Sequence, residues 1–211
     1  MSQTAGCFFC RVPRSEVLMP FGELLRSLRG DHVLVDVRRD KIGGGDLRGF
    51  VADLSDELVL LDIVDDVRAN GQMIVMRDDI SFLRWNTAQM RAWERAVIVA
   101  DVPTAPEPAI DLTDWMSAIT SLESHDRLLT FHRERMDESV CYLARDIELS
   151  FGLVVGLQVS IDGEEDGRFA LQMGDLTRID FGSAYERGLG LILGWSGGIK
   201  ALSPSLSKSK Q

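Results

Sequence analysis

The segment MIVMRDDISFLRW at residues 73–85 recurs in altered form as FALQMGDLTRIDF at residues 169–181. In each copy an apolar, strand-like run leads into a polar turn and then into a second short strand-like run. The triplet Asp79-Ile80-Ser81 falls on Asp175-Leu176-Thr177, and Trp85 falls on Phe181. A match at a fixed spacing indicates that one supersecondary unit is present twice.

The segments that precede this match also follow the same order in both halves of the chain. Each half begins with apolar residues at helical spacing, and alternating stretches typical of strands come next. The first of these strands aligns at a constant offset of 95 residues. Asn70-Gly71 and the acidic run 162–167 predict β-hairpins. The aligned pairs are 21–28 with 112–122 for the helix, and 31–39 with 126–134, 47–54 with 140–147 and 58–64 with 153–159 for the strands.

A stretch with three prolines between Asp101 and Asp111 separates the halves and predicts a stiff linker. Each half then holds one helix and about five short strands in about 70 residues, too few for a sandwich, and closure removes exposed edges. We expect a mainly β fold with flanking helices: two tandem five-stranded, bent-sheet barrels, each preceded by a short helix. The predicted domains are 15–100, with a trailing helix over 87–99, and 110–199; the termini 1–14 and 203–211 are predicted to be flexible.

Charge and hydropathy restrict the classes of partner. The chain has a formal net charge of −10 and a pI near 4.8. Residues 1–105 hold 13 Lys/Arg against 16 Asp/Glu, and residues 106–211 hold 10 against 17. Phosphate backbones repel such a chain unless its cations gather on one face, most strongly in the second half. No apolar run approaches the roughly 20 residues that span a bilayer, and no secretory signal is recognisable. These features predict a cytoplasmic protein without membrane contact.

Residue types that carry catalysis or bind metals form no recognisable set. Cys7 and Cys10 make a Cys-x-x-Cys pair, but no second pair of ligands follows, so we interpret them as incidental. Cys141 lies in a strand-like stretch and is predicted to be a small core residue. His125 and His132 would point to opposite faces of one strand. We therefore expect no enzyme, no catalytic residue, no metal and no cofactor.

Two motifs in the first half resemble those of the Sm-like family of small β-barrel proteins. Residues 49–61, GFVADLSDELVLL, are similar to the first Sm motif, which is a glycine, alternating apolar residues, a turn and an apolar strand. Residues 74–81, IVMRDDIS, are similar to the second motif, a short strand, a turn and a final strand. The spacing is close to that of the bacterial Sm-like RNA chaperones. The resemblance covers residues 20–85 and, more weakly, 112–181, and it implies barrels that pair by their edge strands.

The chain departs from the family at the turn that contacts RNA. The bacterial members have Lys-His there, whereas this chain has Arg77-Asp78-Asp79 in the first half and Met173-Gly174-Asp175 in the second. Phe151, at the first motif's turn in the second half, either stacks on a base or packs within the protein. A basic cluster in the first half is largely cancelled by nearby aspartates. The candidate RNA-binding residues are Arg38, Arg39, Arg48, Arg77 and Phe151.

Two classes of function remain open. The first is a non-enzymatic Sm-like scaffold or binding module, with weak RNA binding through the first barrel. The alternative is a protein–protein interaction or regulatory module that binds no nucleic acid. In both cases we expect a homo-oligomer, either a trimer with six barrels in a ring or a dimer, because a bent five-stranded sheet leaves two edges to be paired. The apolar residues of 189–195 are interpreted as an interface element.

Overall fold

The computed structural model describes residues 20–43, 45–99, 109–123 and 128–194. The first half contains α1 (Phe21–Leu28), β1 (Leu34–Arg38), β2 (Leu47–Leu54), β3 (Leu58–Asp65), β4 (Arg68–Met76), the 3-10 turn η1 (Arg77–Asp79), β5 (Phe82–Trp85) and α2 (Ala88–Val99). The second half contains α3 (Trp115–Glu123), β6 (Leu129–His132), β7 (Cys141–Ser150), β8 (Leu153–Val159), β9 (Glu165–Gln172), the 3-10 turn η2 (Met173–Asp175), β10 (Arg178–Phe181) and α4 (Ala184–Ile192). The predicted termini, Cys7, Cys10, His125 and most of the predicted linker lie outside the described residues.

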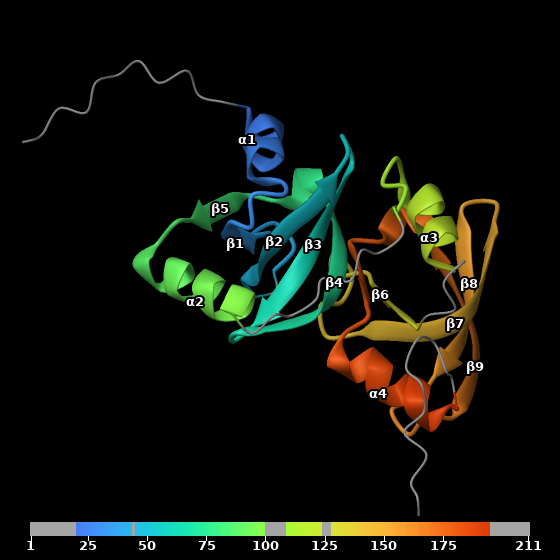
Figure 1. Ribbon diagram of the computed structural model, residues 1–211. Helices are drawn as coiled ribbons and strands as arrows, with labels where there is room; N and C mark the ends of the chain where they lie inside the picture. The colour runs from blue at the N-terminus through green and yellow to red at the C-terminus, as the bar shows by residue number, and fades with distance from the viewer. Residues whose placement is uncertain (1–19, 44, 100–108, 124–127, 195–211) are drawn as a thin grey trace, which may run out of the picture.

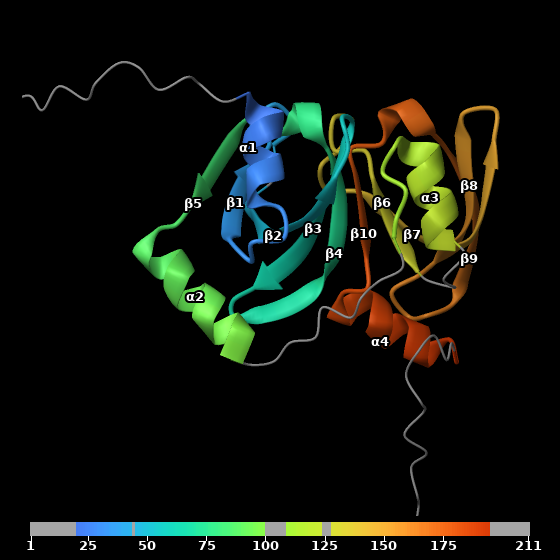
Figure 2. The ribbon, with the colours of Figure 1, turned by 45° about the horizontal axis from the view of Figure 1, so that its top comes forward.

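The ten strands belong to one antiparallel sheet, in the order β5-β1-β2-β3-β4-β10-β6-β7-β8-β9. The first five positions and the last five repeat the same order of equivalent strands. Figures 1 and 2 show the two halves side by side, with α1 and α3 at one end of the molecule and α2 and α4 at the other. The expectation of a mainly β chain with flanking helices is confirmed.

The expectation of two tandem barrels is wrong, because the sheet runs without a break from one half into the other. Among the described strands, neither half closes on itself, since β5 and β4 are the two ends of the first five-stranded group. Instead β4 pairs with β10. Backbone N–H and C=O groups at a strand edge need partners, and for β4 the other half supplies them.

Both halves bend at the same places. Pairing of β2 with β3 shifts register between Val51 and Asp53, and pairing of β3 with β4 shifts between Asp62 and Val64. The second half has its two register shifts in the equivalent strand pairs, β7 with β8 and β8 with β9. Such bulges bend a strand and increase its twist, so the two halves curve in the same way.

Strand pairing fixes which residues are equivalent in the two halves. Val35 lies opposite Trp85 and Leu129 lies opposite Phe181, so β6 corresponds to β1 at an offset of 94 residues. The predicted offset of 95 is therefore wrong by one residue. A slip of one residue exchanges the two faces of a strand, and with the corrected offset the buried Leu128 falls on the buried Leu34.

The remaining strands follow offsets of 95 and 96. Val35 pairs with Gly49 and Leu129 with Ala144, so β7 corresponds to β2 at 95 rather than at the predicted 93. The predicted correspondence of β8 with β3, also at 95, agrees with this pairing. From β4 and β9 onward the offset is 96, which aligns η1 with η2 and β5 with β10. The offset increases because the connecting loops differ in length.

The helices cover the sheet on two sides. In α1, Leu25 and Leu28 pack into a cluster with the inward residues of β1, β2 and β3. In α2, Met90 packs on Leu34, and in α4, Leu189 packs on Leu128. The segment around Leu189, expected to be an interface element, is thus largely a helix that covers the second half. The predicted helices over 21–28, 87–99 and 112–122 correspond to α1, α2 and α3, the last beginning at Trp115.

Asp114 begins α3, because its Oδ1 accepts the N–H of Ser117 at 2.7 Å. One local expectation is corrected. The turn between β3 and β4 lies at residues 66–67, whereas Asn70-Gly71 lies inside β4. The left-handed backbone of Gly71, with φ +79°, serves contact with the other half instead of a hairpin turn.

Candidate functional site

The two halves meet along β4 and β10, and this joint is built first from backbone pairing. The register places Ile74 of β4 opposite Ile179 of β10. Both side chains are fully buried, and they share one apolar cluster with Leu58 and Leu60 of β3 and with Phe131 of β6. The core of the second half therefore includes three buried side chains from the first half.

A close backbone approach marks one end of the joint. At Gly71 a Cβ atom would lie 2.4 Å from the backbone nitrogen of Ser183 and 2.6 Å from the carbonyl oxygen of Phe181, so only glycine fits there. Beside it, Asn70 Oδ1 accepts the N–H of Ala184 at 3.0 Å and so helps to begin α4. The first half thereby positions a helix of the second half.

A buried ion-pair network marks the other end of the joint. The guanidinium of Arg39 donates two hydrogen bonds to the carboxylate of Glu134, at 2.6 and 2.7 Å. Their side chains are only 2% and 3% exposed. Thr177 Oγ1 donates to Glu134 at 2.8 Å, and Arg178 Nη1 donates to it at 3.0 Å. Burial raises the pKa of Glu134, but these donors and positive charges outweigh it, so the pKa lies below its ordinary value.

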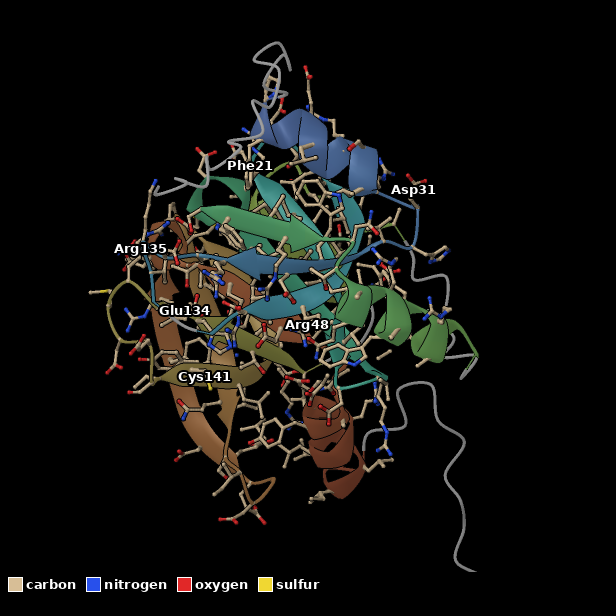
Figure 3. All side chains as sticks on the ribbon, turned by 90° about the vertical axis from the view of Figure 1, so that its left-hand side faces the viewer. Phe21, Asp31, Arg48, Glu134, Arg135 and Cys141 are labelled. Carbon is tan, nitrogen blue, oxygen red and sulfur yellow. The ribbon has the colours of Figure 1, made fainter. Side chains whose placement is uncertain are left out.

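A second ion pair crosses the joint beside this network. Arg135, from the loop after β6, binds the buried carboxylate of Asp79 in η1 and also contacts the sulfur of Met76, 3.6 Å from Nη2. Figure 3 shows Glu134 and Arg135 close together on one side of the molecule, with Arg48 nearer to α2. Both pairs join oppositely charged side chains of the two halves, so the joint has charge complementarity as well as an apolar core.

The predicted RNA-binding arginines do not converge on one site, because each contacts a different carboxylate. Arg77 Nη1 lies 3.1 Å from the carboxylate of Asp56, which Arg26 also binds. The hydrogen bond and charge of Arg26, and then those of Arg77, lower the pKa of Asp56. Arg38 pairs with Asp46 at 2.9 Å. Arg39 is buried in the joint, where RNA has no access to it.

Arg48 belongs to a small pocket of about 360 Å³ with a mixed polar and apolar lining. Its Nε donates to the buried carboxylate of Asp36 at 2.6 Å, and its guanidinium lies over the ring of Trp93. Arg84 Nε donates to the other oxygen of Asp36 at 3.0 Å. Burial raises the pKa of Asp36, but the hydrogen bonds and charges of these two arginines outweigh this effect. The pKa of Asp36 therefore lies below its ordinary value. The pocket also includes residues 87–90 at the start of α2.

Phe151 and Cys141 are both more exposed than expected. Phe151 lies in the turn between β7 and β8, with φ +48°, and its side chain is fully exposed, so the interpretation as a packing residue is wrong. Cys141 is an exposed free cysteine at the start of β7, not a core residue. Desolvation of its sulfur, followed by the charge of Asp180, raises the pKa of the thiol. A thiolate nucleophile needs the opposite shift.

The sequence interpretation expected barrels to pair by their edge strands, but it missed the side chains that form this joint. Glu134 and Arg135 carry it in the second half, yet neither belongs to a recognisable motif. One signal was present: Arg39-Asp40 recurs as Arg133-Glu134 once the correct offset of 94 is used. An Arg-acid pair that is kept in both copies, at the end of equivalent strands, indicates a contact that the repeat itself requires.

Other classes of site find no support in the described part of the chain. Within it, no group of three or more His, Cys, Asp or Glu side chains is arranged to hold a metal ion. Among its helices, none has the length and apolar character needed to cross a bilayer. The chain matches none of the family models, curated proteins or solved structures with which it was compared.

Proposed function

We propose that this protein is a non-enzymatic scaffold of Sm-like architecture that binds protein through the free edges of its sheet. The observation that carries the proposal is the joint between β4 and β10, in which one half of the chain binds the other by adding its strand to an open edge. The ten-stranded sheet ends in β5, which is equivalent to β10, and in β9, which is equivalent to β4. The two outer edges are therefore equivalent to the two edges that pair in the joint.

Support for the Sm-like part comes from the order of elements. Each half has a helix, four antiparallel strands, a 3-10 turn and a short fifth strand that pairs back onto the first strand. This order agrees with the resemblance of residues 49–61 and 74–81 to the two Sm motifs. Paired bulges at equivalent positions supply the bend that such small sheets require.

Support for protein as the ligand comes from β5 and β9, the two edges with which no further strand of the described residues pairs. Strand β5 presents Phe82 and Trp85 with 36% and 39% of their surfaces exposed. Strand β9 has six exposed residues among its eight. An unpaired edge is a template for strand addition, in which backbone hydrogen bonds give affinity and side chains give specificity.

RNA binding through the first half is the second candidate, and the exposed Phe151 favours it. A fully exposed aromatic side chain at a turn is suited to stacking on a base. The arginines argue against it, because Arg38, Arg48 and Arg77 each have a carboxylate partner within the chain. A net charge of −10 adds long-range repulsion. We therefore place protein binding first.

The test compares two glycines that both have left-handed backbones and open surroundings. Gly167 lies in the edge strand β9 with φ +76°, and Gly152 lies in the β7–β8 turn with φ +78°; a Cβ at either has no neighbour within 4 Å. Asn tolerates this backbone better than most residues. Full-length Gly167→Asn, Gly152→Asn and wild-type protein are purified from the native host with a tag.

We expect Gly167→Asn to lose the proteins that co-purify with the wild type, and Gly152→Asn to retain them. The ratio of absorbance at 260 and 280 nm should be that of protein alone. Equal retention by both variants would contradict binding at the β9 edge. RNA in the purified complex, lost on Arg77→Ala or Phe151→Ala, would establish the second candidate instead.

A further inference from the structure

We infer that the pocket beside α2 binds a small carboxylic acid, whose carboxylate is held by Arg48, Arg84 and the backbone at the start of α2. Figure 3 shows Arg48 beside this helix. The pocket has a volume of about 360 Å³. Sites for small molecules typically have about 300–1,000 Å³, so the pocket has room for a compact ligand. This inference goes beyond the proposed function, because the site uses side chains in a pocket and not the backbone edges of the sheet.

Both arginines of the pocket retain hydrogen-bond donors for a ligand. Arg48 donates to Asp36 through Nε, and Arg84 donates to it through Nε and Nη2. Among the described residues, none accepts a hydrogen bond from either Nη of Arg48 or from Nη1 of Arg84. The two side chains are 26% and 44% exposed, so a ligand in solution can reach these donors. A guanidinium group matches the two oxygens of a carboxylate in geometry and charge.

The charges around the pocket favour a ligand with one negative charge. Burial opposes ionisation of Asp36, but the hydrogen bonds and charges of Arg48 and Arg84 keep its pKa below the ordinary value. Two cations and one anion therefore leave one positive charge at neutral pH, and a helix N-terminus adds about half a charge. A carboxylate balances this charge, whereas a phosphate group carries about −1.5 to −2.

The start of α2 supplies further donors to the same pocket. Thr87, Ala88 and Gln89 all line it. The first backbone N–H groups of a helix have no partner within the helix. Thr87 Oγ1 accepts the N–H of Met90 at 3.1 Å, but none of the described residues accepts the N–H of Thr87 itself. The arginines and the start of the helix thus present their donors to one cavity.

The second half of the chain holds a carboxylate at the equivalent place. Glu186 of α4 accepts hydrogen bonds from Thr130 Oγ1 of β6 and from the N–H of Ser183, both at 2.8 Å. Its side chain is buried between the strand and the start of the helix. One copy of the repeat therefore shows that this place accommodates a carboxylate, which the chain supplies there from its own side chain.

The first half lacks this glutamate and has two cations beside the same place. At the offset of 96, Met90 stands where the second half has its glutamate, and Arg84 stands where it has Asp180. At the offset of 95, Arg48 stands where it has Leu143. An internal carboxylate is thus replaced by an apolar side chain, and positive charge is added around the pocket. Both changes favour a carboxylate that comes from outside the chain.

The apolar part of the lining indicates that the ligand has a hydrocarbon body. Met90 and Trp93 line the pocket together with the polar groups. The guanidinium carbon of Arg48 lies 4.2 Å from the centre of the Trp93 ring, which places a donor beside apolar surface. Burial of each methylene group should strengthen binding by about fourfold. We therefore expect butyrate to bind more tightly than acetate.

Saturation-transfer NMR on the full-length chain tests the site with these probes. Acetate and butyrate are titrated at constant ionic strength, and inorganic phosphate is then added as a competitor of bound butyrate. We expect saturable binding of both acids, with the lower Kd for butyrate. The methyl end of butyrate should receive more saturation than the protons next to its carboxylate, because the carboxylate end faces the arginines. Phosphate should displace butyrate only at higher concentrations than acetate does.

Three variants that each change the charge by −1 locate the binding. Arg84→Gln removes a charged donor and should raise the Kd of butyrate by about tenfold or more. Gln89→Glu places a carboxylate in the first turn of α2, which favours the helix and repels the ligand. Its melting temperature should therefore hold or rise while butyrate binding is lost. Arg95→Gln is the control, because Arg95 is exposed in the same helix and does not line the pocket.

Each outcome decides the inference. The absence of saturable binding of butyrate to the wild type would overturn it. An equal rise of the Kd in Arg95→Gln and Arg84→Gln would overturn it as well, since binding would then follow net charge and not the pocket. Displacement of butyrate by less phosphate than acetate would replace the carboxylate with a phosphate ligand. Loss of binding in a Gln89→Glu variant that melts at or above the wild-type temperature would support the site, because a damaged fold could not explain it.

Discussion

Arg39 and Glu134 illustrate how much a single residue contributes to the joint. Taking two charges out of water is costly, and their mutual attraction compensates only when the hydrogen bonds are complete. Glu134 accepts bonds from Arg39, Thr177 and Arg178, so its carboxylate is well satisfied. Removal of one partner leaves a buried charge with too few donors, which is the more damaging change.

We therefore expect Arg39→Leu to lower the free energy of unfolding by about 3–5 kcal/mol. Urea denaturation measures the difference. Arg26→Leu is the matched control, because its partner Asp56 is a surface residue with 83% of its side chain exposed. Exposed pairs contribute about 0–1 kcal/mol, so the control should be nearly neutral. Similar losses in the two variants would contradict the special position of the buried pair.

Acid should weaken the fold through Glu134 and Asp36. Both carboxyl groups have pKa values below their ordinary range in the folded chain. The unfolded chain binds protons first as the pH falls, so their stabilisation is complete above the unfolded pKa values of about 4 and is lost below them. Urea midpoints between neutral pH and about pH 3 should fall steeply below about pH 4.

The variant Glu134→Gln checks the assignment. It should have a lower midpoint at neutral pH and a shallower loss on acidification, because its amide does not titrate. Asp36→Asn should likewise lower the urea midpoint at neutral pH and reduce its loss on acidification. An unchanged pH profile in both variants would show that other carboxylates control acid unfolding.

At the level of elements, β4 is shaped by its neighbour. Asn70-Gly71 has the composition of a hairpin turn, and the sequence prediction placed one there. The structure uses Asn70 to cap α4 and Gly71 to admit the backbone after β10. A contact between residues more than 100 positions apart thus overrides a local preference, which no short-range pattern expresses.

Gly71→Ala tests this contact. A side chain at φ +79° is strained, which costs roughly 1 kcal/mol, and overpacking against fixed backbone adds typically about 1–3 kcal/mol. Gly152→Ala has the same strain at φ +78° but open space around the new methyl group. We expect Gly71→Ala to lose the larger amount of unfolding free energy, measured by urea denaturation. Equal losses of unfolding free energy would mean that backbone strain accounts for the whole effect. The backbone after β10 would then move away from the new methyl group at little cost.

The sequence predicted most of the helices and strands, but it predicted fewer of the residue correspondences between the two halves. Helical spacing located α1 and α2, and the repeated segments located the strands, because apolar periodicity reports local burial directly. The offsets of β6 and β7 were misjudged, since several registers give similar apolar patterns and only strand pairing distinguishes them. The helix α4 was missed, although its Ser183 and Glu186 form a capping box that the sequence contains.

At the scale of the whole molecule, the continuous sheet is the feature least visible in the sequence. The resemblance to Sm-like proteins predicted two barrels, and the alternating pattern within each half agreed with it. Backbone groups, which every residue carries, make the hydrogen bonds between β4 and β10. The pattern of side chains therefore does not predict this pairing. The sequence indicated that nearby aspartates cancel the basic cluster, but it gave no sign of Glu134, the partner of Arg39, which lies 95 positions away.

The shared core predicts how the chain unfolds. Leu58, Leu60 and Ile74 of the first half lie in the same buried cluster as Phe131 and Ile179 of the second. Unfolding of either half would expose apolar surface of the other and break the Arg39–Glu134 pair. We expect a single calorimetric transition, with a van't Hoff enthalpy equal to the calorimetric one, in contrast to two independent domains. The measurement is made on the full-length chain under conditions in which light scattering gives the mass of a single copy. Two resolved transitions, or a van't Hoff enthalpy near half the calorimetric value, would mean that the halves fold separately and that the joint contributes little.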